Sequence, residues 1–178
     1  TNTQIIKEVH FDYIEAGAQY ITANNYAVTQ PILERADLAD QLEDLTLLSL
    51  SIARDAIKES GKDIKLAASL PPLETSYRAD LILDYSKMYD QYQELANILE
   101  GEVDIIICET MAHSLEAKAA LSTIQDSTSE KWLGWTLHGN RSNTLPSGEN
   151  INDVNGEIFE LGRGINYSVN EIANAFGN

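Results

Sequence analysis

The stretch VDIIICET, residues 103–110, is the clearest strand in the sequence. Its centre at 105–108 is continuously apolar, which is typical of a parallel-sheet strand buried on both faces. The strand then ends in Glu109 and Thr110, with no turn residue before them. Ligands of parallel α/β proteins bind at the carboxyl ends of strands, so a carboxylate at this place is a candidate binding group.

Apolar runs and helical periodicities alternate along the rest of the chain. We predict helices at 3–16, from about Glu34 to a stop at Gly61, at 83–99 and at 114–125, and a final helix that opens at a capping box of Ser168 and Glu171. Besides 103–110, strands are predicted at 19–23, 64–69, 131–139 and 162–166. This alternation indicates one α/β domain over residues 1–178, with a parallel sheet covered by helices.

Two architectures fit such a sheet: an open doubly wound sheet, or part of a (β/α)8 TIM barrel, which normally needs about 250 residues. No G-x-G-x-x-G follows the first strand, so the best indication of a dinucleotide-binding sheet is missing. The barrel is favoured because every predicted strand ends in small polar groups. These are Asn24 and Asn25, Ser69, Glu109 and Thr110, His138, and Asn166.

Composition and charge restrict the partners. The chain has 178 residues, 43% of them hydrophobic, and a net charge of −16. Nucleic acids and anionic membrane surfaces need clustered Lys and Arg, so neither is expected as a partner. No apolar run approaches the roughly 18 residues of a membrane span, and the start lacks a signal-peptide pattern, so we expect a soluble cytoplasmic protein. The single cysteine, Cys108, excludes an internal disulfide and cannot by itself form a thiolate metal cluster.

Five segments together resemble the homocysteine S-methyltransferase family, in the family's order and at family-like spacing. Each segment is short, and the resemblance depends on all five along essentially the whole chain. They are VHFDYIEAGAQYITANNY (9–26), LAASLPPLETSYRAD (66–80), VDIIICETMAHSLEAKAAL (103–121), LPSGE (145–149) and GINYS (164–168).

The resemblance implies a zinc-dependent (β/α)8 barrel of methionine biosynthesis. Such an enzyme moves a methyl group from S-methylmethionine, betaine or a methylfolate to the thiol of homocysteine. This chain would supply about strands two to six, an incomplete barrel, with an Asp-Gly-Gly motif upstream and a Gly-Gly-Cys-Cys pair of zinc ligands downstream. Strands two and six would then be exposed edges, which predicts a chain that is poorly stable or associates, for instance as a homo-oligomer.

The resemblance also implies a substrate site. Glu109 matches the family glutamate that holds the amino group of homocysteine, and the alternative is a helix cap or an ion pair with Arg78. Asn24 matches a family asparagine and Asn25 replaces a threonine, but asparagine is equally a turn residue. The substrate-binding candidates are Glu109, Asn24, Asn25, Ser69, Thr110 and Asn166.

Tyr167 departs from the family pattern, because the first zinc cysteine would stand at its position. A phenol with a pKa of about 10 is not expected to replace a thiolate ligand. If Glu109 points at the pocket, its neighbour Cys108 points toward the helices and does not supply the missing ligand. We therefore expect that this chain alone does not bind the family's zinc. The alternative function is a degenerate, zinc-free barrel fragment that binds an amino acid or a thioether without catalysis.

Overall fold

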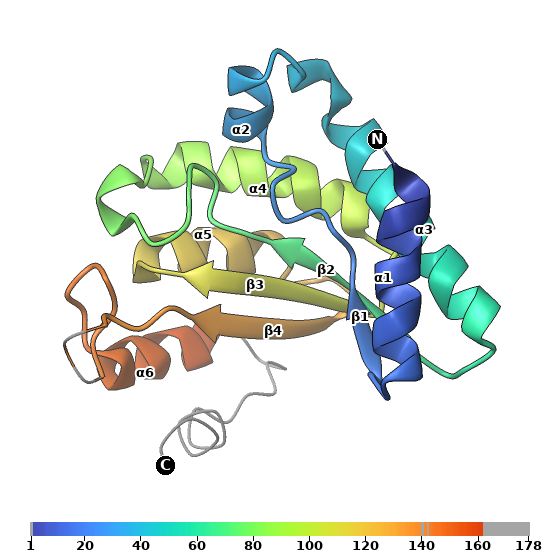
Figure 1. Ribbon diagram of the computed structural model, residues 1–178. Coiled ribbons are helices and arrows are strands. Elements are labelled where there is room, and N and C mark those ends of the chain that lie inside the picture. The colour runs from blue at the N-terminus through green and yellow to red at the C-terminus, as the bar shows by residue number, and fades with distance from the viewer. Residues whose placement is uncertain (1, 140, 142, 162–178) are drawn as a thin grey trace.

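The computed structural model describes residues 2–139, 141 and 143–161, and a parallel sheet forms its centre (Figure 1). The sheet has four strands in the order β1-β2-β3-β4, and all neighbouring strands are parallel. An order without a reversal is that of a barrel wall, since a doubly wound sheet reverses direction at its switch point. The strands are β1 (Tyr20–Thr22), β2 (Lys65–Leu70), β3 (Ile105–Met111) and β4 (Glu130–Trp135).

The helices pack on one face of this sheet. The register places Leu70, Cys108 and Leu133 side by side, and all three belong to one hydrophobic core with residues of α1, α3, α4, α5 and α6. Single-sided coverage is expected when every crossover between parallel strands has the same hand. The helices are α1 (Thr3–Glu15), α2 (Gln30–Arg35), α3 (Leu42–Ser60), α4 (Tyr85–Leu99), α5 (Ser114–Thr123) and α6 (Ile151–Leu161), with 3-10 turns at Ala39–Gln41 and Ala79–Leu81.

The other face of the sheet is concave. In a flat sheet, β1 and β4 would lie roughly 14 Å apart, at about 4.8 Å per strand spacing. Instead, the rings of Tyr20 on β1 and Trp132 on β4 have centroids 5.2 Å apart. Lys65 on β2 likewise reaches Glu130 on β4, with 3.5 Å between the ammonium and the carboxylate. The sheet is therefore curled as in a TIM-type barrel, with the helices outside.

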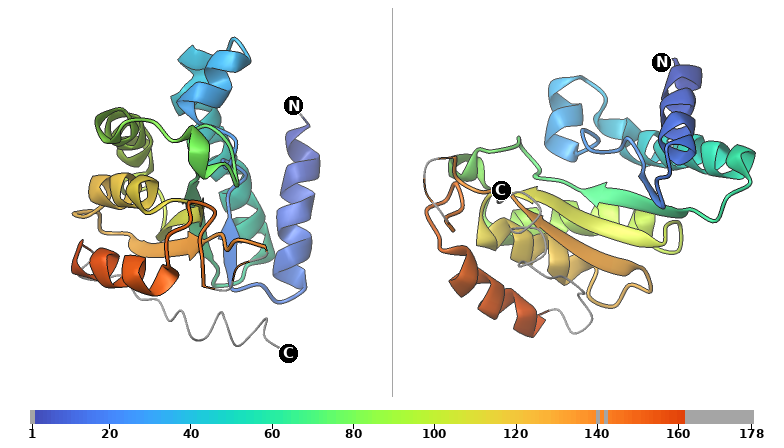
Figure 2. Two further views of the ribbon diagram at one scale, coloured as in Figure 1. Left: turned by 90° about the vertical axis from the view of Figure 1, so that its left-hand side faces the viewer. Right: turned by 60° about the horizontal axis from the view of Figure 1, so that its bottom comes forward.

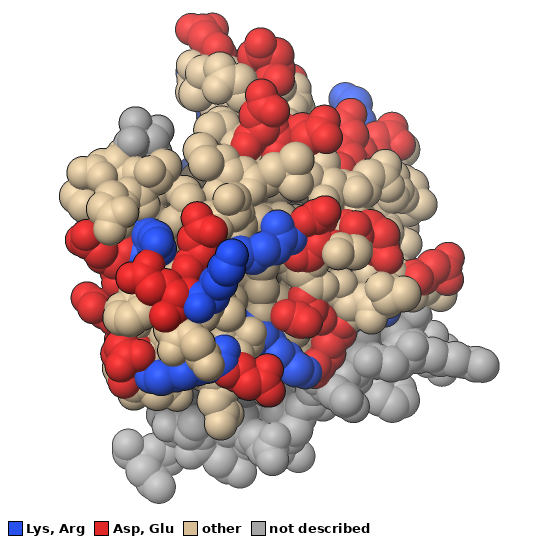
Figure 3. All heavy atoms as spheres, turned by 90° about the vertical axis from the view of Figure 1, so that its right-hand side faces the viewer, with Lys and Arg blue, Asp and Glu red and all other residues tan. Residues whose placement is uncertain are grey.

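The two ends of the strands differ in character. At the carboxyl ends, the segments that follow β2, β3 and β4 gather at one side of the molecule (Figure 2). The amino-end face carries interspersed charges of both signs (Figure 3). Ion pairs on or near that face include Arg54 with Glu102 and Lys62 with Glu15. None of the helices in the described part of the chain is long and apolar enough to cross a membrane.

The helix predicted from about Glu34 to Gly61 is wrong in its first part. The chain forms the short helix α2, leaves the helical conformation, and passes through Asp37 at a left-handed φ of 57° before α3 begins at Leu42. Leu38 packs against the core from this turn, so the apolar periodicity continues across the break and conceals it. The predicted stop is confirmed, because Gly61 caps α3 with a φ of 64°.

Two further differences lie near the end of the described chain. The strand predicted at 131–139 is shorter and ends at Trp135, because beyond Thr136 the chain bonds within its own loop, where the His138 N–H donates to the Thr144 carbonyl at 2.7 Å. Helix α6 was not predicted, since its Asn and Gly residues resemble a loop, yet Ile151, Val154 and Ile158 bury one face of it. The predicted strand 162–166 and the final helix lie outside the described residues.

The orientation of α3 generates a test of this packing. Leu50 is 0% exposed and Leu48 is 40% exposed on the same helix. We expect Leu50→Ala to lower the free energy of unfolding by about 2–5 kcal/mol, because it leaves a core cavity. Leu48→Ala should change it by about 0.5 kcal/mol at most. Urea unfolding of both variants measures the difference, and equal losses would contradict the orientation.

Candidate functional site

Glu109 lies at the carboxyl end of β3, on the opposite side of the strand from Cys108. Cys108 is buried in the core under the helices, whereas Glu109 is half-buried. The hydroxyl of Ser69, at the end of β2, donates a hydrogen bond to the Glu109 carboxylate. Arg78, which the sequence offered as an ion-pair partner for Glu109, pairs with Asp80 instead. Glu109 and Ser69, which were both predicted site residues, therefore lie together at the carboxyl edge of the sheet.

Thr110 follows in a backbone conformation that is rare for its residue type. Its φ is 60°, and the pairing of β3 with β4 is interrupted between Cys108 and Met111. A β-branched residue with positive φ is strained, and bulges next to active sites re-aim side chains. The strand therefore bends at the two residues that the sequence singled out, Glu109 and Thr110.

The two predicted asparagines have different surroundings. Asn25 is buried, and its amide bridges the backbone of Ser69: Nδ2 donates to the carbonyl at 2.8 Å and Oδ1 accepts the N–H at 3.0 Å. The Asn25 side chain thus continues the pairing of β1 with β2 past the end of β1. Asn24 is exposed. Asn166 and Tyr167 lie outside the described residues, and the substrate roles of all three asparagines stay predictions.

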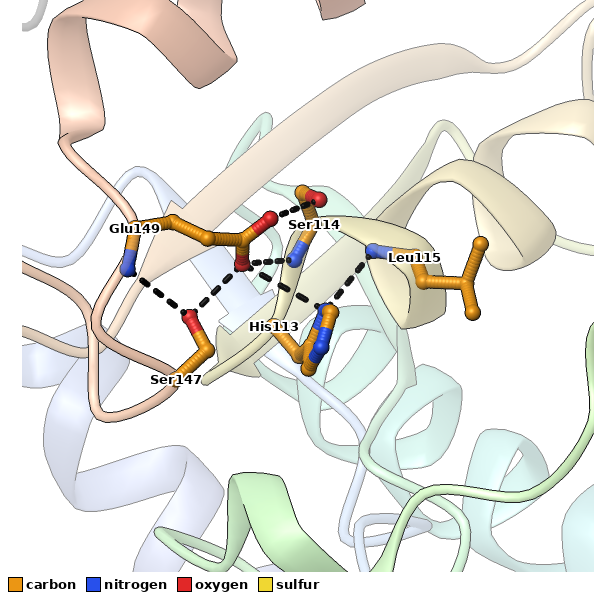
Figure 4. A network of polar contacts seen from close by, with 5 residues as sticks. All are labelled: His113, Ser114, Leu115, Ser147 and Glu149. Carbon is orange, nitrogen blue, oxygen red and sulfur yellow. Dashed lines mark hydrogen bonds and ion pairs between the residues drawn. The ribbon is translucent and has the colours of Figure 1, made fainter.

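A second polar cluster, which sequence reasoning missed, fastens the start of α5 (Figure 4). Glu149, from the loop after β4, accepts the Ser114 N–H at 2.9 Å and also the Ser114 hydroxyl. The hydroxyl of Ser147 donates to the same carboxylate at 2.6 Å. Glu149 therefore satisfies helix-terminal groups from 35 residues away. The only sequence signal was its place in the segment LPSGE.

His113 caps the same helix with its imidazole. Its Nδ1 accepts the Leu115 N–H at 3.1 Å, so neutral His113 has no proton on Nδ1 to donate. Glu149 Oε2 lies 3.3 Å from that nitrogen. An ion pair forms there only when His113 is protonated, and the Leu115 N–H then loses its acceptor. His113 therefore caps the start of α5 through this nitrogen.

The hydrogen bonds around Glu149 control its titration. Burial acts to raise the pKa of Glu149, but the Ser114 hydroxyl, the Ser114 N–H and the Ser147 hydroxyl outweigh it. The pKa of Glu149 consequently lies below the ordinary carboxyl value of 4.5. The hydrogen bonds of this cluster therefore favour the ionised form of Glu149.

The described residues do not match a metal centre. Across 2–139, 141 and 143–161, no group of three or more His, Cys, Asp and Glu side chains is arranged to hold a metal ion. Cys108 is fully buried on the helix side of β3, and burial raises the pKa of its thiol far above the usual range. A thiol in such an apolar environment is a poor source of thiolate ligand.

The bridge from Asn25 to Ser69 gives a first test of the site. Asn25→Ala leaves two backbone groups of buried Ser69 without their partners, so we expect a loss of about 2 kcal/mol or more in unfolding free energy. Asn24→Ala, at the exposed neighbour, should change stability by about 0.5 kcal/mol or less. Chemical unfolding of the two variants checks this, and equally small effects would refute the structural role of Asn25.

The cluster at the start of α5 gives a second test, through pH. A carboxyl group whose pKa is depressed by folding stabilises the fold above its unfolded pKa and loses that contribution as pH falls through the folded pKa. We expect Glu149→Gln to cost about 1–3 kcal/mol of unfolding free energy at pH 7. The difference from the unsubstituted protein should shrink as the pH falls below about 4.5. Urea unfolding of both proteins across pH measures this, and a difference that is constant with pH would contradict it.

Comparisons with known proteins agree with this architecture. The sequence model of the family described as "Homocysteine S-methyltransferase" matches residues 1–170. Homocysteine S-methyltransferase 1 of Brassica oleracea var. italica is 26% identical over 174 residues, which cover 84% of this chain and 52% of the relative. Methionine synthase of Mycobacterium tuberculosis is 28% identical over 124 residues, 68% of this chain and 10% of that protein. The chain spans about half the length of the curated plant relatives it matches.

Solved structures show the same fold. The metallated form of the homocysteine methyltransferase MmuM from Escherichia coli superimposes with a TM-score of 0.82 at 23% identity, over 92% of this chain and 61% of MmuM. The oxidised form gives a TM-score of 0.77 at 25% identity, over 87% of this chain and 57% of MmuM. The barrel-type fold and the family that the sequence predicted are both confirmed. Since the family match spans nearly all of the sequence, the chain belongs to the homocysteine S-methyltransferase family.

Proposed function

We propose that this chain forms the amino-acid-binding part of a methyltransferase that moves a methyl group to the thiol of homocysteine, giving methionine. The observation that carries the proposal is the half-buried carboxylate of Glu109 at the carboxyl end of β3, beside the Ser69 hydroxyl. A carboxylate at such an edge attracts an ammonium group through charge-assisted hydrogen bonds. Family membership supports homocysteine as the amino acid whose ammonium group binds there.

The geometry of the site supports a single orientation of the amino acid. Ser69 donates to Glu109 from one side, and its own backbone is fixed by Asn25. The carboxylate is therefore oriented before any ligand arrives, which lowers the entropic cost of binding. With the ammonium held at β3, the thiol would extend over the concave side of the sheet.

For the methyl donor, we infer a cationic or zwitterionic molecule such as S-methylmethionine or betaine. The chain carries a net charge of −16, which repels polyanionic donors and attracts cationic ones at long range. In methyl transfer from an onium donor, the bond between the methyl carbon and the positively charged sulfur or nitrogen breaks, and its electron pair stays on the neutralised donor atom. The homocysteine sulfur forms the new bond to that carbon, and the thiol proton passes to water. Across the described residues, no group of side chains fits a zinc site.

A second function, amino-acid or thioether binding without transfer, is favoured by two observations. Tyr167 stands where the family resemblance places a cysteine ligand. Cys108, the single cysteine, is buried away from the concave face. In this alternative Glu109 has the same role, so binding and turnover must be measured separately.

Glu109→Gln tests both functions. An amide loses the charge that pairs with an ammonium, a contact of about 1.5–3 kcal/mol. We expect the Kd for L-homocysteine, measured by calorimetry, to rise roughly 10- to 150-fold. Glu130→Gln is the matched control, because Glu130 lies on the same sheet at the amino end of β4 and should leave the Kd unchanged.

The outcomes separate the two candidate functions. Methionine formed from L-homocysteine and S-methylmethionine or betaine, detected by mass spectrometry, supports methyl transfer. Binding that depends on Glu109 but gives no methionine supports the binding function instead. If Glu109→Gln and Glu130→Gln have the same Kd as the unsubstituted protein, Glu109 is not the ammonium site.

A further inference from the structure

A buried carboxylate on the outer layer of the molecule connects α5 to the segment that follows β2. Glu116 lies in the first turn of α5 and is only 5% exposed. Its Oε1 accepts the Leu73 N–H at 3.0 Å and lies 3.3 Å from the hydroxyl oxygen of Tyr92. Tyr92 is fully buried on α4, and its hydroxyl donates to the Pro71 carbonyl at 2.8 Å. No sequence pattern indicates this contact, since an acidic residue in a first helical turn is ordinary.

The segment 69–73 is held from several directions by side chains rather than by strand pairing alone. Thr29, from the loop after β1, donates to the Leu73 carbonyl at 2.8 Å, so both backbone polar groups of Leu73 have side-chain partners. Asn25 does the same for Ser69 at the other end of the segment. Buried backbone groups need such partners, and here they come from three separate elements.

We propose that Glu116 is a positioning residue for the Glu109 site. Glu116 accepts the Leu73 N–H and Tyr92 donates to the Pro71 carbonyl, so residues 71–73 are fixed. These residues follow Ser69 directly in the chain, and the Ser69 hydroxyl orients the Glu109 carboxylate. The inference rests on the proposed function, because it takes Glu109 as the ammonium-binding group. It assigns Glu116 no contact with substrate.

The burial of Glu116 supports a role in positioning the backbone of the segment after β2. Burial raises the pKa of Glu116, with the Leu73 N–H and Tyr92 hydroxyl opposing that rise. Removing a carboxylate from water costs several kcal/mol, and an apolar side chain at this place would avoid that cost. What the carboxyl group contributes, and a leucine would not, is an acceptor for the Leu73 N–H and a polar neighbour 3.3 Å from the Tyr92 hydroxyl, which itself donates to Pro71.

The test compares Glu116→Leu, which has similar volume and no polar atoms, with Glu116→Gln, which keeps an acceptor for the Leu73 N–H. Asp104→Ala is the matched control, because Asp104 accepts the Leu66 N–H at 2.8 Å at the amino end of the same strand, β2. It removes the same kind of bond at the edge of the sheet away from Glu109. Each variant is measured for its Kd for L-homocysteine and for amide hydrogen exchange at Ser69.

We expect Glu116→Leu to raise the Kd for L-homocysteine about tenfold, the equivalent of one lost buried hydrogen bond. Glu116→Gln should restore the Kd to within about twofold, and Asp104→Ala should leave it unchanged while lowering stability. If Glu116→Leu does not fold, Tyr92→Phe carries the test, because it removes only the hydroxyl and should raise the Kd about threefold.

Equal Kd values for Glu116→Leu and Asp104→Ala at equal loss of stability would overturn the proposal. Exchange at Ser69 distinguishes this failure from failure of the proposed function, because it needs no ligand. If Glu109→Gln does not affect L-homocysteine binding, the proposed function fails, and faster Ser69 exchange in Glu116→Leu still supports positioning. Unchanged Ser69 exchange in Glu116→Leu overturns positioning whatever the binding result.

Discussion

The arrangement at the carboxyl edge depends on one constraint: the chain is buried from the end of β2 into the segment that follows, and its backbone polar groups need partners beyond those that strand pairing supplies. Two prolines remove N–H donors at 71 and 72, and side chains supply partners for the remaining groups at Ser69, Pro71 and Leu73. Because these partners come from the loop after β1, from α4 and from α5, one short segment fixes the relative positions of three elements.

Two carboxyl groups at the start of α5 extend this constraint to the neighbouring loops, and their surroundings shift their pKa values in opposite directions. Burial raises the pKa of Glu116, while hydrogen bonds from Ser114 and Ser147 overcome burial and lower the pKa of Glu149. Glu116 connects the helix to the segment after β2, and Glu149 connects it to the loop after β4. The turn between Glu109 and α5 is thereby fixed from both sides, which suits a site that must hold a ligand in one orientation.

The sequence predicted the order and the type of most elements, because parallel strands and amphipathic helices leave strong local patterns. It also placed Glu109 and Ser69 at the ends of adjacent strands, and the structure joins them. The errors arose where local pattern and backbone conformation disagree. Leu38 continued an apolar period across a turn made by left-handed Asp37, and the Asn-rich and Gly-containing helix α6 is held by burial of Ile151, Val154 and Ile158.

By itself, the sequence determined the alternation of strands and helices and the position of Glu109 at the end of a strand, since each depends on residues close together along the chain. It also determined the family, which depends on the order of several short segments. Only the tertiary structure decided that Asn25 bridges the backbone of Ser69, that Glu116 holds Leu73, and that Glu149 caps α5. These contacts join residues 35 to 44 positions apart. Hydrogen bonds at such separations follow from how the layers pack, and no local periodicity records them.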